Sequence, residues 1–335
     1  MPEFPPTPEQ QTILDAVRST KSNLMIRARA GCGKTTMLEM IDHSEKSQPY
    51  LLMCFNKAIA TEAEKRMRSA TTVRTFNSLG HKIWAAAVDR KLSLNQKKIL
   101  EIFRAIADET PRGERSYLWS MYDSVLAATS IARNIGYIPP DHFKASKSLC
   151  DFRAVERLLD ETLLPEAEAL INKILTISIG QAYNGVIDFT DQVYMPALFG
   201  GTYPSFPVVL VDEYQDLSPV NRAMVGRLCK HSRQIGVGDE AQAIYEFRGA
   251  DVRAMPDAIE QFGMETLPLS TSFRCPSAIT DNVHWHVPDI TSSREGGVVA
   301  RGNVHSIIDN SAVICRYNAP LIALAMELLS SGHKV

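Results

Sequence analysis

Ala28-Arg29-Ala30-Gly31-Cys32-Gly33-Lys34-Thr35-Thr36 is the stretch of this 335-residue sequence that decides its fold. It follows the apolar segment Asn23–Ile26 and precedes Met37–Ile41, an order that predicts a strand, a glycine-rich loop and a helix. Glycines let backbone N–H groups approach a phosphate closely, and the start of the helix adds the positive end of its dipole. The loop therefore predicts a phosphate-binding site, although the general pattern begins with glycine where this chain has Ala28.

The residues of this loop have separate predicted roles. Lys34 is positioned to reach the β- and γ-phosphates of a nucleotide, and the Thr35 hydroxyl to join the coordination shell of a Mg²⁺ ion. The predicted nucleotide-binding set comprises Ala30, Gly31, Cys32, Gly33, Lys34, Thr35 and Thr36.

Composition argues against several classes of protein. Hydrophobic residues make up 45% of the chain and charged residues 22%, as in ordinary soluble globular proteins. The net charge of −2 provides no overall basic field, so we expect any nucleic-acid partner to be held by a local surface. The six cysteines are scattered without metal-ligand spacing, and no apolar run is long enough to cross a membrane or serve as a signal core. We expect a soluble, non-secreted protein with reduced thiols in a cytoplasmic compartment.

Strand-like and helical runs alternate in the outer parts of the chain. Thr7 is predicted to cap a helix from about Pro8 to Thr20, and strands are predicted over residues 24–28, 50–55, 71–75, 208–211, 234–237 and 266–269. This alternation predicts an α/β fold with a parallel sheet covered by helices. From about residue 91 to 181, apolar residues recur at helical spacing and strand signals vanish, which predicts an all-helical insertion. A last unit, with a strand over Ala312–Cys315 and a helix over Leu321–Leu329, resembles the opening of another α/β domain.

A second motif supplies carboxylates. The segment Val208–Asp216, Val-Val-Leu-Val-Asp-Glu-Tyr-Gln-Asp, predicts a buried strand with acidic residues at its C-terminal end, the edge where ligands bind in open α/β sheets. Asp212 is placed to hold Mg²⁺ through water, and Glu213 to orient and deprotonate an attacking water. The alternative, a solvated acidic turn that caps the next helix, is disfavoured because Lys34 lies upstream.

A third motif follows over Ile235–Ala250. Gln242 can reach a γ-phosphate or its water. Tyr245, Phe247 and Arg248 offer two aromatic rings and a guanidinium, a combination that stacks the bases of a single strand. The alternative is that the two rings only fill the gap between sheet and helix.

Taken in order, Ala30–Thr35, Asp212–Asp216 and Gly238–Ala250 resemble the motifs of UvrD/Rep-type DNA helicases of superfamily 1. The long third motif is the most specific, and Ala28 is common in the loop of that family. The resemblance implies RecA-like P-loop NTPase domains, ATP and Mg²⁺ as cofactors, and movement in the 3′-to-5′ direction on single-stranded DNA with unwinding at single/double-strand junctions. It also implies location in the cytoplasm of a bacterial or phage-infected cell.

The resemblance implies further roles at the nucleotide site. Gln10, in Thr7-Pro-Glu-Gln10, matches the glutamine that hydrogen-bonds adenine, with Gln11 as its rival if the helix phase is shifted. Phe273 stands where the family stacks an aromatic ring on adenine, and Arg274 where it supplies a charge to the γ-phosphate.

Two segments match the DNA-contacting motifs of the family, Cys54–Ala58 in a shortened form and Thr75–Ser78. Asn77 stands where the family usually has histidine, and Ile187–Asp191 matches the segment that closes the helical insertion. The DNA-binding residues implied by these segments are Phe55, Asn56, Lys57, Thr75, Phe76 and Asn77.

The resemblance also implies domain boundaries. The first RecA-like motor domain is expected over residues 1–90 and 182–270, the helical insertion over 91–181, and an incomplete second RecA-like domain over 271–335, because the later motifs of the family are not found before Val335. Two alternatives stay open: an ATP- and DNA-binding module with little catalysis of its own, and the motor subunit of a helicase–nuclease complex whose nuclease belongs to a partner chain.

Overall fold

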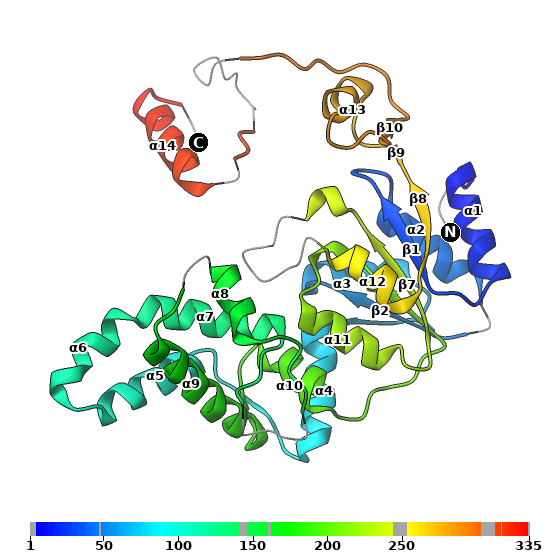
Figure 1. The fold of residues 1–335 in the computed structure, drawn as a ribbon. Helices are drawn as coiled ribbons and strands as arrows, with labels where there is room; N and C mark the ends of the chain where they lie inside the picture. Colours follow the sequence, from blue (N-terminus) through cyan, green and yellow to red (C-terminus); the bar gives the residue numbers. More distant parts are fainter. Residues whose placement is uncertain are drawn as a thin grey trace. The chain divides into compact units, whose positions relative to one another are not determined.

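The larger of two compact units is built on a sheet of six parallel strands. The computed structural model describes residues 5–46, 48–140, 146–159, 162–243, 253–302, 312–315 and 317–333, which divide into the units Met1–Gly296 and Gly297–Val335. The strand order is β3-β2-β6-β7-β1-β8 (Figure 1). The strands are β1 (Leu24–Ala28), β2 (Tyr50–Cys54), β3 (Thr72–Thr75), β6 (Val208–Val211), β7 (Arg233–Gly238) and β8 (Glu265–Leu269). The predicted parallel sheet is therefore confirmed, with strand bounds close to those expected.

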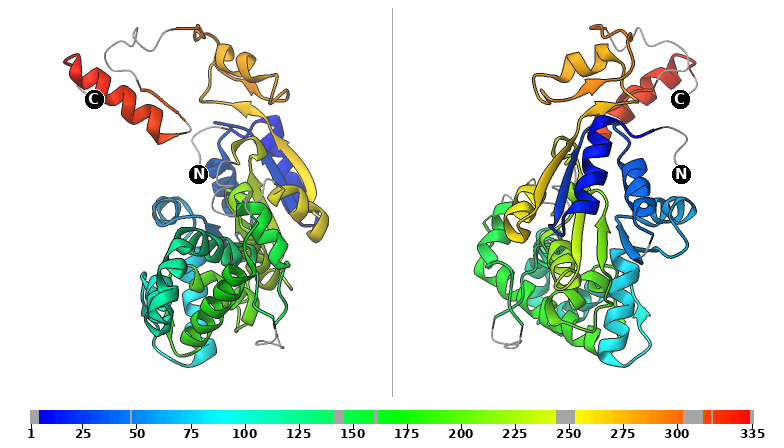
Figure 2. Two further views of the ribbon diagram at one scale, coloured as in Figure 1. Left: turned by 60° about the vertical axis from the view of Figure 1, so that its left-hand side comes forward. Right: turned by 90° about the vertical axis from the view of Figure 1, so that its right-hand side faces the viewer.

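Alternate residues of each strand face opposite layers of helices, because successive side chains of a strand point to opposite faces. One face, which includes Met25 and Val209, packs against α4 (Phe76–Val88), α10 (Asp191–Phe199), α11 (Pro219–Leu228) and α12 (Ala254–Phe262). The other, which includes Ile26 and Leu210, packs against α1 (Pro8–Ser19), α2 (Lys34–Ser44) and α3 (Lys57–Arg66). Figure 2 shows the helices on both sides of the sheet. Burial on both faces explains why the strands are continuous apolar runs in the sequence.

The helix starts are set by local hydrogen bonds. Thr7 caps α1 as predicted: its Oγ1 accepts from the Gln10 N–H at 3.3 Å, and the Gln10 Oε1 accepts from the Thr7 N–H at 2.9 Å. The same reciprocal arrangement begins α4 at Thr75 and α11 at Ser218. These caps satisfy backbone donors that a helix leaves unpaired at its first turn, and they fix where each helix begins.

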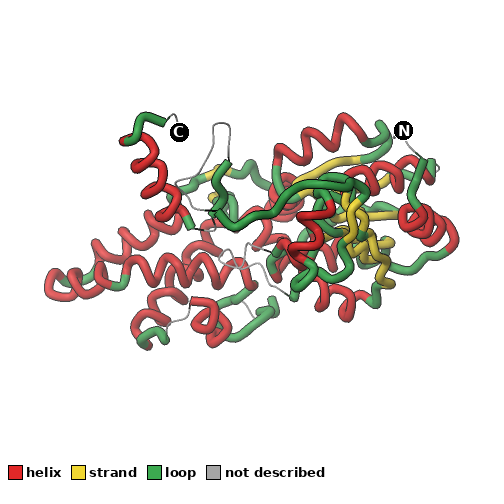
Figure 3. The backbone as a smooth tube through the Cα atoms, turned by 90° about the horizontal axis from the view of Figure 1, so that it is seen from above, coloured by secondary structure: helices red, strands yellow, loops and turns green. Residues whose placement is uncertain are grey.

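The predicted helical insertion is present and has a core of its own. It contains α5 (Lys98–Glu109), α6 (Arg112–Ser120), α7 (Tyr122–Ile135), α8 (Phe152–Leu159) and α9 (Pro165–Tyr183), which bury residues such as Phe103 and Ile171. Figure 3 shows this region as helices joined by loops. A short parallel ladder between β4 (Ser93–Leu94) and β5 (Val186–Ile187), which the sequence did not indicate, joins the two ends of the insertion.

The last part of the larger unit holds β9 (Thr271–Ser272), α13 (Ser277–Val283) and β10 (Thr291–Ser292). In the smaller unit, the described residues contain α14 (Asn318–Ser330), as expected. The strand predicted over Ala312–Cys315 is wrong, because this apolar segment has no strand beside it among the described residues of the unit to complete a ladder. The described residues include no helix with both the length and the apolar character needed to span a membrane.

Candidate nucleotide and nucleic-acid sites

The candidate residues follow the carboxyl ends of the strands in the main sheet. Because the strands are parallel, these ends meet at one edge, which is the usual ligand-binding edge of such folds. The glycine-rich loop follows β1, Asp212 follows β6, and Asp239 follows β7. Further along the same edge, Phe55 follows β2 and Phe76 follows β3. The fold thus gathers residues from all three motifs at this edge.

The glycine-rich loop has the backbone geometry that its sequence predicts. Gly31 and Gly33 take up left-handed φ angles of 73° and 84°, and Lys34 is the first residue of α2. The Gly31 carbonyl accepts a hydrogen bond from the Phe273 N–H at 2.9 Å. A Cβ atom on Gly31 would lie 2.5 Å from the Cβ of Arg274, so this close approach requires glycine. The structure therefore brings the predicted adenine-stacking and γ-phosphate residues next to the loop, with the Phe273 side chain 43% exposed.

Lys34 and Glu213 form an ion pair across the site, with the lysine Nζ donating to Oε2 of Glu213. Glu213 has a left-handed φ of 47°, one of two non-glycine residues with positive φ in the described parts of the chain. Such strained backbone costs on the order of 1–3 kcal/mol and is concentrated at functional sites. This conformation and the bond to Lys34 together hold the Glu213 carboxylate beside the glycine-rich loop.

Gln215 links the two acidic strand ends, a role that sequence reasoning missed. Its Nε2 donates to Oε2 of Glu213 at 2.9 Å, and its Oε1 accepts from the Asp239 N–H at 2.9 Å. A Cβ on Gly238 would lie 2.7 Å from Oε1 of Gln215, so the glycine makes room for this bridge. The signal available in the sequence was its place between Tyr214 and Asp216 in the second motif.

Two buried carboxylates, those of Asp212 and Asp216, lie close enough to Glu213 to feel its charge. Burial, reinforced by the neighbouring charge of Glu213, raises the pKa of Asp212 to about 6 and that of Asp216 to about 6. The Oδ1 atom of Asp216 is buried and has no hydrogen-bond partner within the described residues. The site is therefore short of positive charge, which suits a bound cation.

The two side chains predicted to hold Mg²⁺ have the chemistry that this ion requires. The Thr35 hydroxyl and the Asp212 carboxylate are hard oxygen donors, which Mg²⁺ prefers. In the parts of the chain that the structure describes, no group of three or more histidine, cysteine or acidic side chains is arranged to hold a metal.

Arg29, inside the glycine-rich loop, ties this loop to the segment that follows β8. Its Nη1 donates to Oδ1 of Asp239 at 3.1 Å and its Nη2 to Oδ2 of Asp289 at 2.8 Å. Asp239 in turn accepts from the Nε2 of Gln242, the predicted γ-phosphate sensor at the end of η2 (Glu240–Gln242). Gln242 is thereby held toward the loop through Asp239 and Arg29.

The two candidate adenine-reading glutamines lie in different surroundings. Gln10 is buried and its Oε1 belongs to the cap of α1, whereas the Gln11 Nε2 donates to Oδ1 of Asp15 at 2.7 Å. The Glu9 carboxylate accepts from the backbone N–H and the hydroxyl of Ser270 at 2.9 and 2.6 Å, which fixes the start of α1 beside the segment leading to Phe273.

Cys32 is buried, and burial raises the pKa of its thiol to about 12, so this cysteine is an unreactive thiol at neutral pH.

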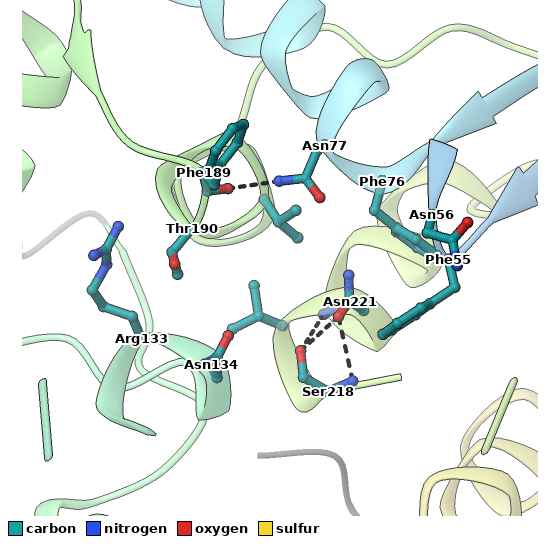
Figure 4. Close-up of a pocket in the computed structure, with 12 residues that line it drawn as sticks. Phe55, Asn56, Phe76, Asn77, Arg133, Asn134, Phe189, Thr190, Ser218 and Asn221 are labelled. Carbon is teal, nitrogen blue, oxygen red and sulfur yellow. Dashed lines mark hydrogen bonds between the residues drawn. The ribbon is translucent and has the colours of Figure 1, made fainter. Parts of the chain in front are cut away.

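A cavity with a volume of about 330 Å³ lies where β2 and β3 end, at the same edge of the sheet (Figure 4). Four of the predicted DNA-contacting residues line it: Phe55, Asn56, Phe76 and Asn77. The helical insertion and the segments after it supply the rest of the lining, which sequence reasoning missed: Arg133, Asn134, Phe189, Thr190, Val193, Ser218, Val220 and Asn221. Aromatic rings and side-chain amides are the groups that stack and hydrogen-bond exposed bases. The Arg133 guanidinium is not free to do so, since its two Nη atoms donate to Asp188 and Asp191.

The other predicted DNA-contacting residues do not line this cavity. Thr75 has its hydroxyl in the cap of α4, where it accepts from the Ser78 N–H at 3.1 Å. Lys57 is the exposed first residue of α3. Tyr245, Phe247 and Arg248 lie outside the described residues, so their roles stay predictions.

Residues 8–263 match the family described as UvrD/REP helicase N-terminal domain. Among curated proteins, the chain is similar to F-box DNA helicase protein 1 of Schizosaccharomyces pombe, with 25% identity over 284 residues that cover 82% of this chain and 32% of that protein. It is 27% identical to DNA helicase II of Escherichia coli over 297 residues, which cover 79% of this chain and 38% of the relative. It is 25% identical to DNA helicase IV of Escherichia coli over 310 residues, which cover 79% of this chain and 45% of that relative. The chain thus spans between about a third and a half of the length of these relatives.

Proposed function

The chain belongs to the UvrD/REP helicase family, and on this basis we propose that it is an ATP-dependent DNA helicase or translocase that moves 3′ to 5′ on single-stranded DNA. ATP is proposed to bind at the glycine-rich loop, with its γ-phosphate near Lys34, Gln242 and Arg274. Glu213 takes a proton from the attacking water. The observation that carries this proposal is the Lys34–Glu213 ion pair, which sets a phosphate-binding cation and a general base side by side.

Mg²⁺ is proposed to bind through Thr35 and Asp212. When bound, the ion supplies positive charge beside the phosphate oxygens. The raised pKa of Asp212 supports this assignment, because a nearby cation stabilises the ionised form of a carboxylate that burial disfavours.

Single-stranded DNA is proposed to cross the cavity between the main sheet and the helical insertion, with single/double-strand junctions as the preferred substrate. The three phenylalanine rings and the amides that line the cavity support this role. Tyr245, Phe247 and Arg248 are proposed to extend the same DNA-binding surface. The free thiols of all six cysteines are compatible with action in the cytoplasm of a bacterial or phage-infected cell.

Phosphate release with and without oligothymidylate tests the proposal. We expect ATP turnover that rises when DNA is added, and no turnover in Lys34→Ala at any DNA concentration. Phe247→Ala is expected to lose the stimulation by DNA while it keeps nucleotide binding. A chain that binds ATP and DNA without turnover would instead be a binding module, and normal turnover by Lys34→Ala would refute the site assignment.

A further inference from the structure

Four charged side chains form a buried cluster between the helical insertion and the base-binding cavity: Lys98, Arg133, Asp188 and Asp191. Side-chain exposure is 0% for Lys98, 1% for Asp191, 4% for Arg133 and 11% for Asp188. Charged residues are rarely buried this deeply, since removing them from water is costly. We refer to these four residues as the charge cluster.

The cations of the cluster come from two helices of the insertion. Lys98, at the start of α5, donates from its Nζ to Oδ2 of Asp191 at 2.6 Å and to the Ser178 carbonyl at 2.7 Å. Arg133 of α7 donates to Oδ2 of Asp188 at 2.7 Å and to Oδ1 of Asp191 at 2.9 Å. Burial alone would raise the pKa of Asp188, but the charge of Arg133 lowers it, so this carboxylate stays ionised at neutral pH.

The same two carboxylates close the turn over residues 188–191. The Asp188 N–H donates to Oδ2 of Asp191 at 3.0 Å, and the Asp191 N–H donates to Oδ1 of Asp188 at 2.9 Å. Each carboxylate therefore binds both the backbone of the turn and a cation of the insertion. The two residues between them, Phe189 and Thr190, line the cavity.

Phe189 depends on this turn for its position. The residue is 50% exposed, so packing alone does not hold the ring. Its carbonyl accepts a hydrogen bond from Nδ2 of Asn77 at 2.7 Å, which anchors the turn from the side of the main sheet (Figure 4). The turn is thus held from the sheet by Asn77 and from the insertion by the charge cluster.

We infer that Lys98 and Arg133 are positioning residues for DNA binding: they hold the 188–191 turn so that Phe189 stands at the rim of the cavity. The helical insertion is thereby coupled to the grip on single-stranded DNA, because α5 and α7 carry the cations that fix the turn. This inference rests on the proposed function, in which the cavity binds bases.

Lys98→Met is the central test, because Lys98 is fully buried, does not line the cavity and cannot touch DNA. Affinity for fluorescein-labelled oligothymidylate is measured by anisotropy, together with affinity for a fluorescent ATP analogue. We expect Lys98→Met and Phe189→Ala each to weaken oligothymidylate binding by roughly fivefold or more, the effect of losing one stacked base. Nucleotide affinity should stay within about twofold of the wild type. Arg133→Lys, which keeps the charge but loses the two-pronged bridge, is the second variant if Lys98→Met does not fold.

The double variant Lys98→Met/Phe189→Ala separates positioning from general destabilisation. We expect it to bind no more weakly than Phe189→Ala alone, since both changes remove the same contact. Arg68→Lys is the matched control: it alters an ion pair with Asp42 of similar burial, at 12% and 0% exposure, that does not line the cavity, and it should leave DNA affinity unchanged.

The outcomes distinguish this inference from the proposed function. Additive losses in the double variant, or a loss in Phe189→Ala with none in Lys98→Met and Arg133→Lys, would overturn the positioning role and leave the base-binding cavity intact. Unchanged DNA affinity in Phe189→Ala would overturn both the base-binding assignment of this rim and the positioning role.

Discussion

Lys34 and Glu213 are bonded to each other across the edge of the sheet, although they lie 179 positions apart in the chain. The pair joins the glycine-rich loop to the end of β6, and its side chains are only 15% and 26% exposed. Phosphate oxygens compete with Glu213 for the same ammonium group. We therefore expect ATP binding to draw Lys34 onto the phosphates and leave the Glu213 carboxylate available as a base.

The two members of this pair are expected to respond differently to substitution. Glu213→Gln keeps a side chain of the same size but cannot accept a proton, so turnover should fall by about 10²–10⁴-fold while ATP still binds. Lys34→Ala should lose both binding and turnover. Titration with a fluorescent ATP analogue and steady-state phosphate release measure the two effects, and wild-type turnover in Glu213→Gln would exclude it as the base.

The raised pKa of Asp212 makes stability depend on pH. Its value of about 6 in the fold lies above the ordinary 3.8, so the fold favours the protonated form. The stability that this group contributes is complete below pH 4 and is lost as the pH rises through 6. Asp212→Asn mimics the protonated form, and at pH 7.5 it should raise the free energy of unfolding by up to about 3 kcal/mol.

Urea unfolding at several pH values, without Mg²⁺ or nucleotide, checks this prediction. The difference between Asp212→Asn and the wild type should shrink toward zero as the pH falls from 7.5 to 4. A difference that does not change with pH would show that the Asp212 carboxyl does not titrate in this range.

The base-binding cavity predicts a selective loss of DNA affinity. Phe55→Ala removes a ring from its lining and should weaken oligothymidylate binding by about 1–3 kcal/mol, with nucleotide affinity unchanged. Tyr117→Ala in α6 is the control, because this aromatic residue is 50% exposed and lies outside the cavity lining. Equal losses in the two variants would argue against a specific base site.

Two glycines in helices are expected to differ sharply. A Cβ on Gly80 of α4 would lie 1.9 Å from the carbonyl oxygen of Gln192 in α10, whereas a Cβ on Gly180 of α9 would meet nothing within 4 Å. Gly80→Ala should therefore destabilise the protein by about 3 kcal/mol or more, because backbone must move. Gly180→Ala should stabilise it by about 0.5–1 kcal/mol through helix propensity. Thermal unfolding measures both, and similar changes in melting temperature would contradict the close packing of α4 on α10.

Local patterns predicted the elements of the sheet well. The strand Leu24–Ala28 and the cap at Thr7 were readable because burial on both faces and side-chain capping leave signals within a few residues. The strand Ser93–Leu94 could not be predicted, since a strand of two residues is too short to show any periodicity. Ala312–Cys315 carries the composition of a strand, but composition cannot show whether a partner strand lies beside it.

The candidate sites divide in the same way. The glycine-rich loop and Asp212 are recognisable because their chemistry is encoded in consecutive residues. Only four of the twelve residues that line the cavity were predicted, since others, such as Phe189 and Asn221, reach it from elements far apart in the chain. Lys98 looks like an ordinary surface lysine on an amphipathic helix, and only the fold shows it buried against Asp191.

The strand order has a consequence for synthesis on the ribosome. β1 and β2 emerge early but are not neighbours, because β6 and β7 lie between them. Until Val208 has been added, β2 can pair with β3 alone, so one of its edges stays open. Both edges of β1 stay open, because its partners are β7 and β8. At ~5–20 residues per second, the interval between the synthesis of β2 and the addition of Val208 lasts roughly 8–30 s. During that time the open strand edges of the nascent chain must be protected. Chaperones can supply this protection, and so can early folding of the helical insertion, whose core is made of contacts within its own segment.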